Sequence, residues 1–226
     1  MAIGFVNSQL NNTSSGAASA VTSANYTPSA GNCLVIVGGF EFNGLATHIV
    51  LSTTTGNTIT NATDGQVHEY ANTNNIAVWV IPNVNGTAGT WTVTSTGYAG
   101  NGQVDIFEYS GVDLGGAQDG TASGANSNVS PNITTASGSS AIIVAGCYGA
   151  GNTNGRTSTH SGSFVQRGND AVAGASVTGC CLADLIGPTP GTYSDTIAWS
   201  PAPGSTFDST VILALMSTGA VISWVT

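Results

Sequence analysis

The sequence has almost no positive charge. Its 226 residues include two Arg, no Lys and eleven Asp or Glu, which gives a formal net charge of −9 at pH 7. Charged residues make up 6% of the chain, against roughly 25% in an ordinary soluble domain. Arg156 and Arg167 alone cannot neutralise a run of phosphates, so we exclude nucleic-acid binding. A polybasic membrane-binding patch is excluded for the same reason.

The chain also lacks a run of the ~18 apolar residues that a transmembrane helix needs. Residues 1–7 contain no basic side chain and only a short apolar run, so we expect no signal peptide. In contrast, a chain rich in Gly, Ser, Thr and Asn with two tryptic cleavage points is typical of a protein exposed to proteases outside the cell. Both observations agree if the protein is made in the cytoplasm and leaves by lysis or within a particle.

The four cysteines lack the spacing of a metal site. No Cys-x-x-Cys pair occurs and the three histidines are scattered, so a zinc site is not expected. Cys180 and Cys181 are adjacent and would point to opposite faces of a strand. Two alternatives remain for Cys33, Cys147, Cys180 and Cys181. They are free, buried, small apolar residues, or two of them form one disulfide, which could join two subunits.

Short apolar runs rich in β-branched residues dominate the rest of the chain, and Gly, Asn, Ser, Thr and Pro separate them. No apolar stripe with a 3.6-residue period persists for ten residues, which predicts that helix is nearly absent. Asn85-Gly86 and Asn101-Gly102 are typical of turns between strands. The pattern predicts an all-β fold, an antiparallel β-sandwich of the jelly-roll type. The expected strands are 2–6, 33–42, 47–51, 66–70, 75–81, 90–96, 103–110, 140–148, 163–167, 175–185, 192–199, 209–217 and 220–225.

The chain repeats part of its own pattern. Residues 34–38 resemble 142–146, residues 89–94 resemble 191–196, and residues 104–110 align with 211–217. One half cannot cover its own sheet face, so we expect two pseudo-repeated halves, 33–112 and 140–217, to pack as one sandwich. Residues 113–139 would link them. Residues 1–32 would form an N-terminal strand and a Ser/Asn/Thr-rich arm ahead of a single domain at 33–226.

No pattern of catalytic residues stands out. The sequence contains no nucleophile elbow, P-loop, dinucleotide fingerprint or HExxH motif. Asp105 and Glu108 differ by three positions, so on a strand they face opposite ways and do not form a carboxylate pair. We therefore expect no enzyme activity and assign no catalytic or cofactor-binding residue. Asp113 and Asp119 offer oxygen ligands for a structural calcium ion, although their spacing fits no standard loop.

Both ends of the chain carry apolar strands without a charged residue. An exposed apolar edge strand without Lys invites pairing with another chain. We therefore expect the subunit contacts at the two ends; the alternative is that the termini pair with each other in one subunit. The expected contact residues are Ile3, Phe5, Val6, Val221, Ile222, Trp224 and Val225.

One longer motif resembles a known group of proteins. The run VDIFEYSGV at 104–112 is followed by Asp119-Gly120-Thr121 and by an apolar strand from Ala141. Upstream, Val37-Gly38-Gly39-Phe40 and the turn Gly56-Asn57-Thr58 fit the same pattern. The sequence resembles the β-sandwich modules with an EYSGV…DGTA pattern in structural proteins of tailed phages and in bacterial surface proteins. The resemblance implies a jelly-roll-like sandwich and carries over no catalytic residue.

The first hypothesis for the function is a structural component of a bacteriophage virion. Within that class a capsid decoration (cement) protein is preferred to a tail component. Such a protein is made in the host cytoplasm and released with the particle. Its partners would be copies of itself and a major capsid or other virion protein, and weak contacts repeated over a lattice would suffice for retention. The alternatives are a glycan-binding adhesion module of a tail fibre or cell surface, and a subunit of an extracellular protein filament.

Overall fold

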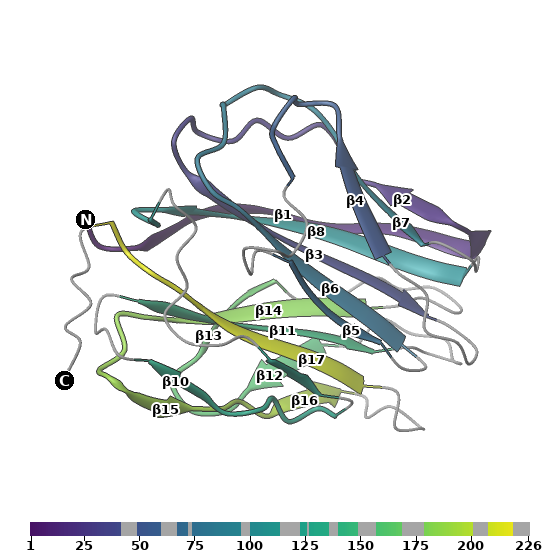
Figure 1. Cartoon of the computed structure of the whole chain (residues 1–226). Coiled ribbons are helices and arrows are strands. Elements are labelled where there is room, and N and C mark those ends of the chain that lie inside the picture. The colour runs from purple at the N-terminus through teal and green to yellow at the C-terminus, as the bar shows by residue number, and fades with distance from the viewer. Residues whose placement is uncertain are drawn as a thin grey trace.

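The computed structural model confirms the all-β class (Figure 1). It describes residues 1–41, 49–59, 67–71, 74–95, 100–113, 123–125, 127–135, 140–148, 157–168, 179–200 and 208–218. Within these ranges every regular element is a strand, and every pair of neighbouring strands is antiparallel. The same part of the chain holds no helix long and apolar enough to cross a membrane.

Two five-stranded inner sheets lie face to face in the middle of the molecule (Figure 1). The first has the order β1 (Gly4–Ala18), β8 (Gly100–Ser110), β3 (Cys33–Glu41), β6 (Asn74–Ile81) and β5 (Val67–Ala71). The second has the order β13 (Val165–Gly168), β14 (Gly179–Ile186), β11 (Ala141–Tyr148), β17 (Asp208–Leu215) and β9 (Ser123–Ala125). β1 lies against β13 and β5 lies against β9, so each strand in the order given for the first sheet faces the strand at the same place in the order given for the second.

Smaller outer sheets cover the far face of each inner sheet. β2 (Ala20–Thr22), β7 (Trp91–Ser95) and β4 (Ile49–Thr53) cover the first. Two pairs cover the second: β10 (Ile133–Thr135) with β15 (Gly191–Tyr193), and β12 (Thr157–His160) with β16 (Ile197–Ser200). The molecule therefore has four layers (Figure 1). We call β1–β8 the N-half and β9–β17 the C-half.

This layering corrects the expectation that one half cannot cover its own sheet face. Each half is a sandwich in itself, and the two sandwiches pack through their inner sheets. The covering strands β2, β10 and β12 are only three or four residues long and consist mostly of Thr, Ser and Ala. They have no apolar run from which a strand could be predicted.

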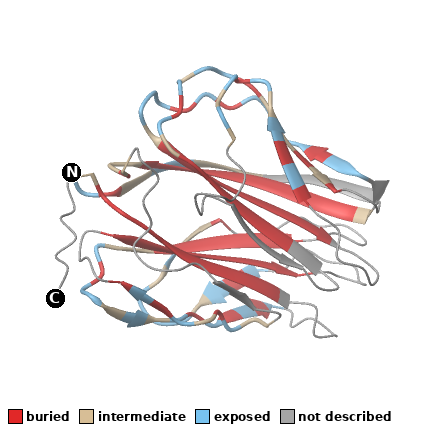
Figure 2. Cartoon of the chain, viewed as in Figure 1, coloured by how far each residue is buried: buried red, intermediate tan, exposed pale blue. Residues whose placement is uncertain are grey.

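Three hydrophobic cores follow from the four layers (Figure 2). Alternate residues of an inner strand enter different cores, as the two-residue period of a strand requires. In β3, Val35 and Val37 face the core shared by the two halves, whereas Leu34 and Ile36 face the core inside the N-half. The apolar strands expected from the sequence supply seven fully or almost fully buried side chains: Val35, Val37, Ile106, Phe107, Ile143, Val211 and Leu213.

The two halves correspond in strand order. Setting β1–β6 and β8 against β9–β14 and β17 reproduces the inner-sheet order, and β7 corresponds to β15 and β16 together. The alignment of 104–110 with 211–217 is off by one residue, because Val104 faces the N-half core and Val211 faces the shared core. A slip of one residue exchanges the two faces of a strand. The repeat in the sequence itself stays a prediction.

Residues 7–22 are not the strand-free arm that the sequence suggested. β1 continues to Ala18 and pairs with β8 along its length, and β2 pairs with β7. These residues are mostly uncharged and polar, so backbone pairing rather than apolar alternation holds them in the sheets. The expected linker likewise contains β9 and β10. Asn101-Gly102 lies inside β8 rather than in a turn, and the expected strand at 220–225 falls outside the described residues.

Gly111 joins the end of β8 to the chain ends. It has a φ of +73°, and a Cβ built on it would overlap with the backbone carbonyl of Ala2. Its own carbonyl accepts a hydrogen bond from the N–H of Thr218, whose carbonyl in turn accepts one from the N-terminal amine of Met1. This junction has no room for a side chain.

We expect Gly111→Ala to lower the free energy of unfolding by about 2–4 kcal/mol, because the left-handed backbone and the overlap both oppose a methyl group. Gly31→Ala is the matched control. Gly31 has a φ of +84° but no atom within 4 Å of a Cβ, so only the conformational cost of about 1 kcal/mol applies. Urea unfolding of both variants measures the difference, and equal losses would contradict the close approach to Ala2.

Candidate functional site

One side of the molecule exposes the edges of both inner sheets. Among the described strands, β1 pairs only with β8 and β13 only with β14, and β1 lies against β13. β1 has 15 residues, none of them charged and none Pro, so it lacks the residues that usually protect an edge strand. Val6 on β1 is 44% exposed and Val165 on β13 is 49% exposed. We call β1 and β13 with these two valines the edge surface.

Bulges divide the length of the edge strand β1. Its pairing register with β8 shifts between Phe5 and Asn7, between Gln9 and Asn12, and between Ser14 and Ala18. Bulges twist an edge strand and limit regular pairing with a neighbour. Residues 7–9 form a regular stretch directly after Val6. This short stretch, next to the exposed Val6, is suited to strand addition.

The residues expected to contact other subunits have different surroundings. Ile3 is buried in the shared core, and Phe5 packs against that core from β1. Of the three N-terminal residues, Val6 is therefore the exposed one. Val221, Ile222, Trp224 and Val225 lie outside the described residues. The subunit contact stays a prediction.

A charged cluster lies beneath the edge surface and connects the two halves. The carboxylate Oδ2 of Asp184 on β14 accepts a hydrogen bond from Nε of Arg167 at 2.8 Å and one from the hydroxyl of Tyr109 on β8 at 3.0 Å. The guanidinium carbon of Arg167 lies 4.6 Å from the ring centre of Phe5, and Phe5 meets Tyr109 edge to face. No pattern in the sequence indicated this cluster, because its members come from four strands.

The protonation states of the cluster follow from its burial. Burial raises the pKa of Tyr109, and the negative charge of Asp184 raises that pKa further. The hydrogen bond to Asp184 raises the pKa of Arg167. Tyr109 is therefore a neutral donor and Arg167 a cation at neutral pH. The other carboxylate oxygen of Asp184, Oδ1, is buried and has no hydrogen-bond partner.

A polar groove opens at the end of the N-half. It has a volume of about 350 Å³ and is lined by Gly56, Asn57, Thr58, Ile81, Pro82, Asn83 and Asn85. Asn57 and Asn85 are fixed to each other, because the backbone N–H of Asn85 donates to Oδ1 of Asn57 at 2.8 Å. Asn83 has a φ of +55°, which makes it the one described non-glycine residue with a positive φ. Strained backbone of this kind tends to gather at binding sites.

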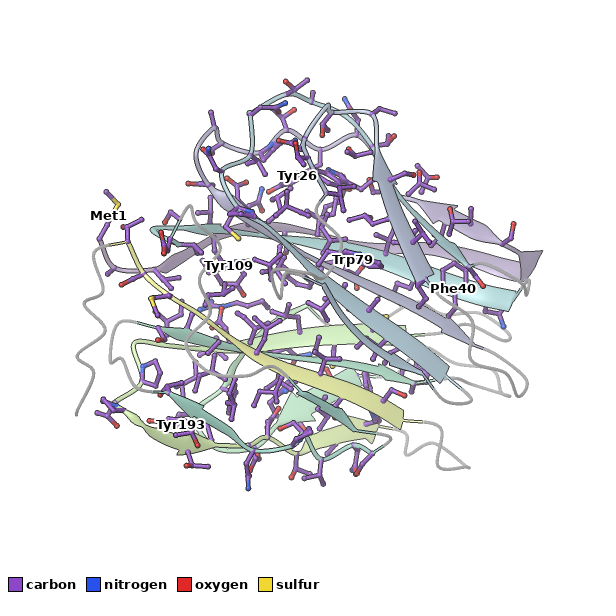
Figure 3. All side chains as sticks on the ribbon, viewed as in Figure 1. Met1, Tyr26, Phe40, Trp79, Tyr109 and Tyr193 are labelled. Carbon is purple, nitrogen blue, oxygen red and sulfur yellow. The ribbon has the colours of Figure 1, made fainter. Side chains whose placement is uncertain are left out.

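Glu108 holds the loop beside this groove against β8. Its carboxylate is buried and accepts hydrogen bonds from the hydroxyl of Tyr26 at 2.7 Å, the backbone N–H of Ser29 at 2.9 Å and the amide of Asn32 at 2.6 Å. Burial alone would raise the pKa of Glu108, but the three hydrogen bonds outweigh it and hold the pKa below the ordinary value. Tyr26 and Tyr109 lie on opposite sides of the inner sheet (Figure 3). As the sequence predicted, Asp105 faces the side of the strand opposite to Glu108. There its carboxylate accepts a hydrogen bond from the side-chain amide of Gln103.

The C-half contains a His–Asp pair that sequence analysis missed. Nδ1 of His160 lies 2.5 Å from Oδ2 of Asp195, and the other oxygen of Asp195 accepts from the N–H and hydroxyl of Ser161. Burial would raise the pKa of Asp195, but hydrogen bonds from His160 and Ser161 lower it below the ordinary value. Nε2 of His160 has no hydrogen-bond partner, and the side chain is 1% exposed. An external substrate cannot reach that nitrogen, so the pair holds the turn after β12.

The calcium site expected at Asp113 and Asp119 stays a prediction. The backbone N–H of Asp113 donates to the carbonyl of Met216, which ties it to the C-half. Asp119 lies outside the described residues. In the part of the chain that the structure describes, no three His, Cys, Asp or Glu side chains are grouped to hold a metal ion.

Comparisons with known proteins do not identify a family for this chain. The sequence matches no protein-family model and no curated protein. Among solved structures, the chain is similar to HutD from Pseudomonas fluorescens SBW25, with 11% identity over 88% of this chain and 78% of that one and a TM-score of 0.27. For PNGase F, a glycosylasparaginase from Flavobacterium meningosepticum, the identity is 8%, each chain is covered to 95% and the TM-score is 0.31.

A third structure is the N-terminal CBM22-1–CBM22-2 tandem domain of Paenibacillus barcinonensis Xyn10C. It has 10% identity over 96% of this chain and 93% of that one, with a TM-score of 0.24. Likenesses at these TM-scores carry no argument about function.

Proposed function

We propose that this chain is a structural component of a bacteriophage virion, a capsid decoration (cement) protein that binds copies of itself and a major capsid or other virion protein. The observation that carries the proposal is the edge surface. Among the described strands, β1 and β13 are sheet edges that lie together on one side of the molecule, and the longer one, β1, has no charged residue. Such an edge favours strand addition by a neighbouring chain.

The rest of the molecule suits a protein that stands on a particle surface. Trypsin-like proteases have two cleavage points, Arg156 and Arg167. The second is in β13, with its guanidinium bound to Asp184. Three buried cores hold the four layers together. A particle binds many copies at once, so each contact needs only modest strength.

The edge surface can be tested with one lysine at a time. We expect Val6→Lys or Val165→Lys to weaken binding to the particle about tenfold or more, because a charge on an edge strand opposes strand pairing. Val129→Lys is the control: Val129 is 44% exposed but lies in the C-half outside the edge strands. Occupancy on purified particles, measured by quantitative mass spectrometry, gives the result.

Equal occupancy of all three lysine variants would place the contact elsewhere on the molecule. A mass-spectrometric survey that finds the chain in no phage particle, or in host cell walls instead, would overturn the virion assignment itself.

The polar groove favours a second candidate, a glycan-binding adhesion module. Its lining offers amide and hydroxyl groups with no charged side chain, which suits a neutral ligand rich in hydroxyl groups. The fixed pair Asn57 and Asn85 supplies a preorganised wall. A glycan array tests this candidate, with Asn83→Gly as the variant that removes the amide but keeps the positive φ. Binding that persists unchanged in this variant would exclude the groove as the glycan site.

A further inference from the structure

Two of the four cysteines face each other across neighbouring strands. Cys147 on β11 and Cys180 on β14 are direct partners in the antiparallel register. Direct partners have α-carbons about 4.5–5.5 Å apart, within the range of roughly 4.4–6.8 Å found for disulfide-bonded cysteines. The backbone therefore already has the spacing that a disulfide needs.

Both sulfur atoms point to the same place on the facing sheet. A Cβ built on Gly39 of β3 would overlap with Sγ of Cys147 and lie 2.6 Å from Sγ of Cys180. The two thiols thus occupy the space that a side chain at Gly39 would need. Two sulfur atoms gathered at one point are near neighbours, and rotation about their Cα–Cβ bonds can bring them to bonding distance.

The other two cysteines have register partners that are not cysteines. Cys181 faces the C-half core rather than the shared core, and burial raises the pKa of its thiol. Cys33 lies on β3, where burial raises the pKa of its thiol to about 12. Its register partner on β8 is Tyr109, which is not a cysteine. Neither residue has a cysteine opposite it, so each is expected to stay a single thiol.

We propose that Cys147 and Cys180 are a crosslinking site, which forms an intramolecular disulfide when the chain folds in the presence of a small-molecule disulfide such as oxidised glutathione. One cysteine thiolate attacks the glutathione disulfide and releases one glutathione thiolate. The second cysteine thiolate then attacks the mixed disulfide and releases the other. The protein loses two protons and two electrons, and one oxidised glutathione becomes two reduced ones.

Burial sets when this reaction can occur. Both side chains are fully buried in the core between the halves, so the oxidant reaches them before the halves close or when they separate. The crosslink should therefore form readily during refolding and slowly in the native protein. It would close a loop that contains β12 and β13, and it would fix the strand that carries Arg167 and Val165.

The scarcity of basic residues gives a sharp test. Complete tryptic digestion of denatured protein yields three fragments, 1–156, 157–167 and 168–226, because only Arg156 and Arg167 are cleaved. Cys147 lies in the first fragment and Cys180 in the last. After refolding from urea with oxidised glutathione, these two fragments should stay joined on a non-reducing gel and separate after reduction. Intact mass should fall by about 2 Da, and alkylation should label two thiols instead of four.

Variants identify which cysteines are joined. Cys147→Ala or Cys180→Ala should abolish the joined fragment, whereas Cys33→Ala and Cys181→Ala should retain it. Mapping the linked peptides of the wild-type chain by mass spectrometry gives the same answer without depending on the folding of any variant. Four alkylated thiols in the refolded protein, or a linkage through Cys33 or Cys181, would overturn the proposal.

Discussion

Replacing Asp184 with alanine is expected to lower the free energy of unfolding by about 2–4 kcal/mol. Asp184 is fully buried and is the shared acceptor of Arg167 and Tyr109. Without it the Tyr109 hydroxyl stays buried with no acceptor. The guanidinium of Arg167, whose side chain is 24% exposed, can turn toward water and limits the loss. Urea unfolding, followed by tryptophan fluorescence, measures the change.

An apolar version of the cluster is the control for this result. We expect the triple variant Asp184→Val, Tyr109→Phe and Arg167→Met to recover most of the lost stability, since buried ion clusters are often replaceable by apolar residues of similar volume. The N-half gives the precedent. Val80 pairs with Val35 as Asp184 pairs with Ile143, so the equivalent position already holds a valine. An Asp184→Ala variant as stable as the wild type would mean that the cluster does not hold the halves together.

Replacing Glu108 with alanine is expected to cost a similar amount, about 2–4 kcal/mol, because it leaves three hydrogen-bond donors of one loop without their acceptor. The loss should appear first as local opening of the loop that contains Tyr26, Ser29 and Asn32. Hydrogen exchange of the Ser29 amide measures that opening. Exchange of amides in β11, in the other half, is the internal reference.

The pH dependence of the Glu108 contribution has a definite sign. The folded pKa of Glu108 lies below its ordinary value, so the ionised form is the one that stabilises the fold. The contribution is complete above the unfolded pKa of about 4.3 and is lost as the pH falls through the folded pKa. Glu108→Gln cannot ionise. The stability difference between wild type and Glu108→Gln should therefore shrink on acidification from pH 7 to pH 3, and a constant difference would contradict the assignment.

The central strands and the outer strands β4, β7, β15 and β16 could be predicted from the sequence, whereas β2, β9, β10, β12 and most of β1 could not. β3, β6, β8, β11, β14 and β17 carry apolar runs, and the sequence predicts each of them within a few residues. β1, β2, β10 and β12 are polar, and pairing with distant strands holds them in place. Cys180 and Cys181 do enter different cores, because that expectation needs only the period of a strand.

The polar clusters depend on contacts that no local pattern reveals. Tyr109 and Asp184 are 75 positions apart and meet only because the inner sheets face each other. His160 and Asp195 are 35 positions apart and come from different connections of the C-half. In the sequence Glu108 is only one of two acids that face opposite ways on a strand, which gives no hint of its role in holding a loop. Short segments of the chain predict the fold class, whereas these clusters can be predicted only when the topology is known.

The pairing of β1 with β8 has a consequence for synthesis of the protein. Gly4 is the register partner of Ser110, so the inner sheet of the N-half cannot close until the ribosome has released the first 110 of the 226 residues. The inner sheet of the C-half cannot be completed before β17 is synthesised, and β17 ends at Leu215. In the interval a finished N-half presents Val35, Val37 and Phe107 to water. Such non-local pairing is slow to form and exposes the nascent chain to aggregation. Slower translation at low temperature prolongs the interval, and a chaperone that binds apolar sheet faces would shield it.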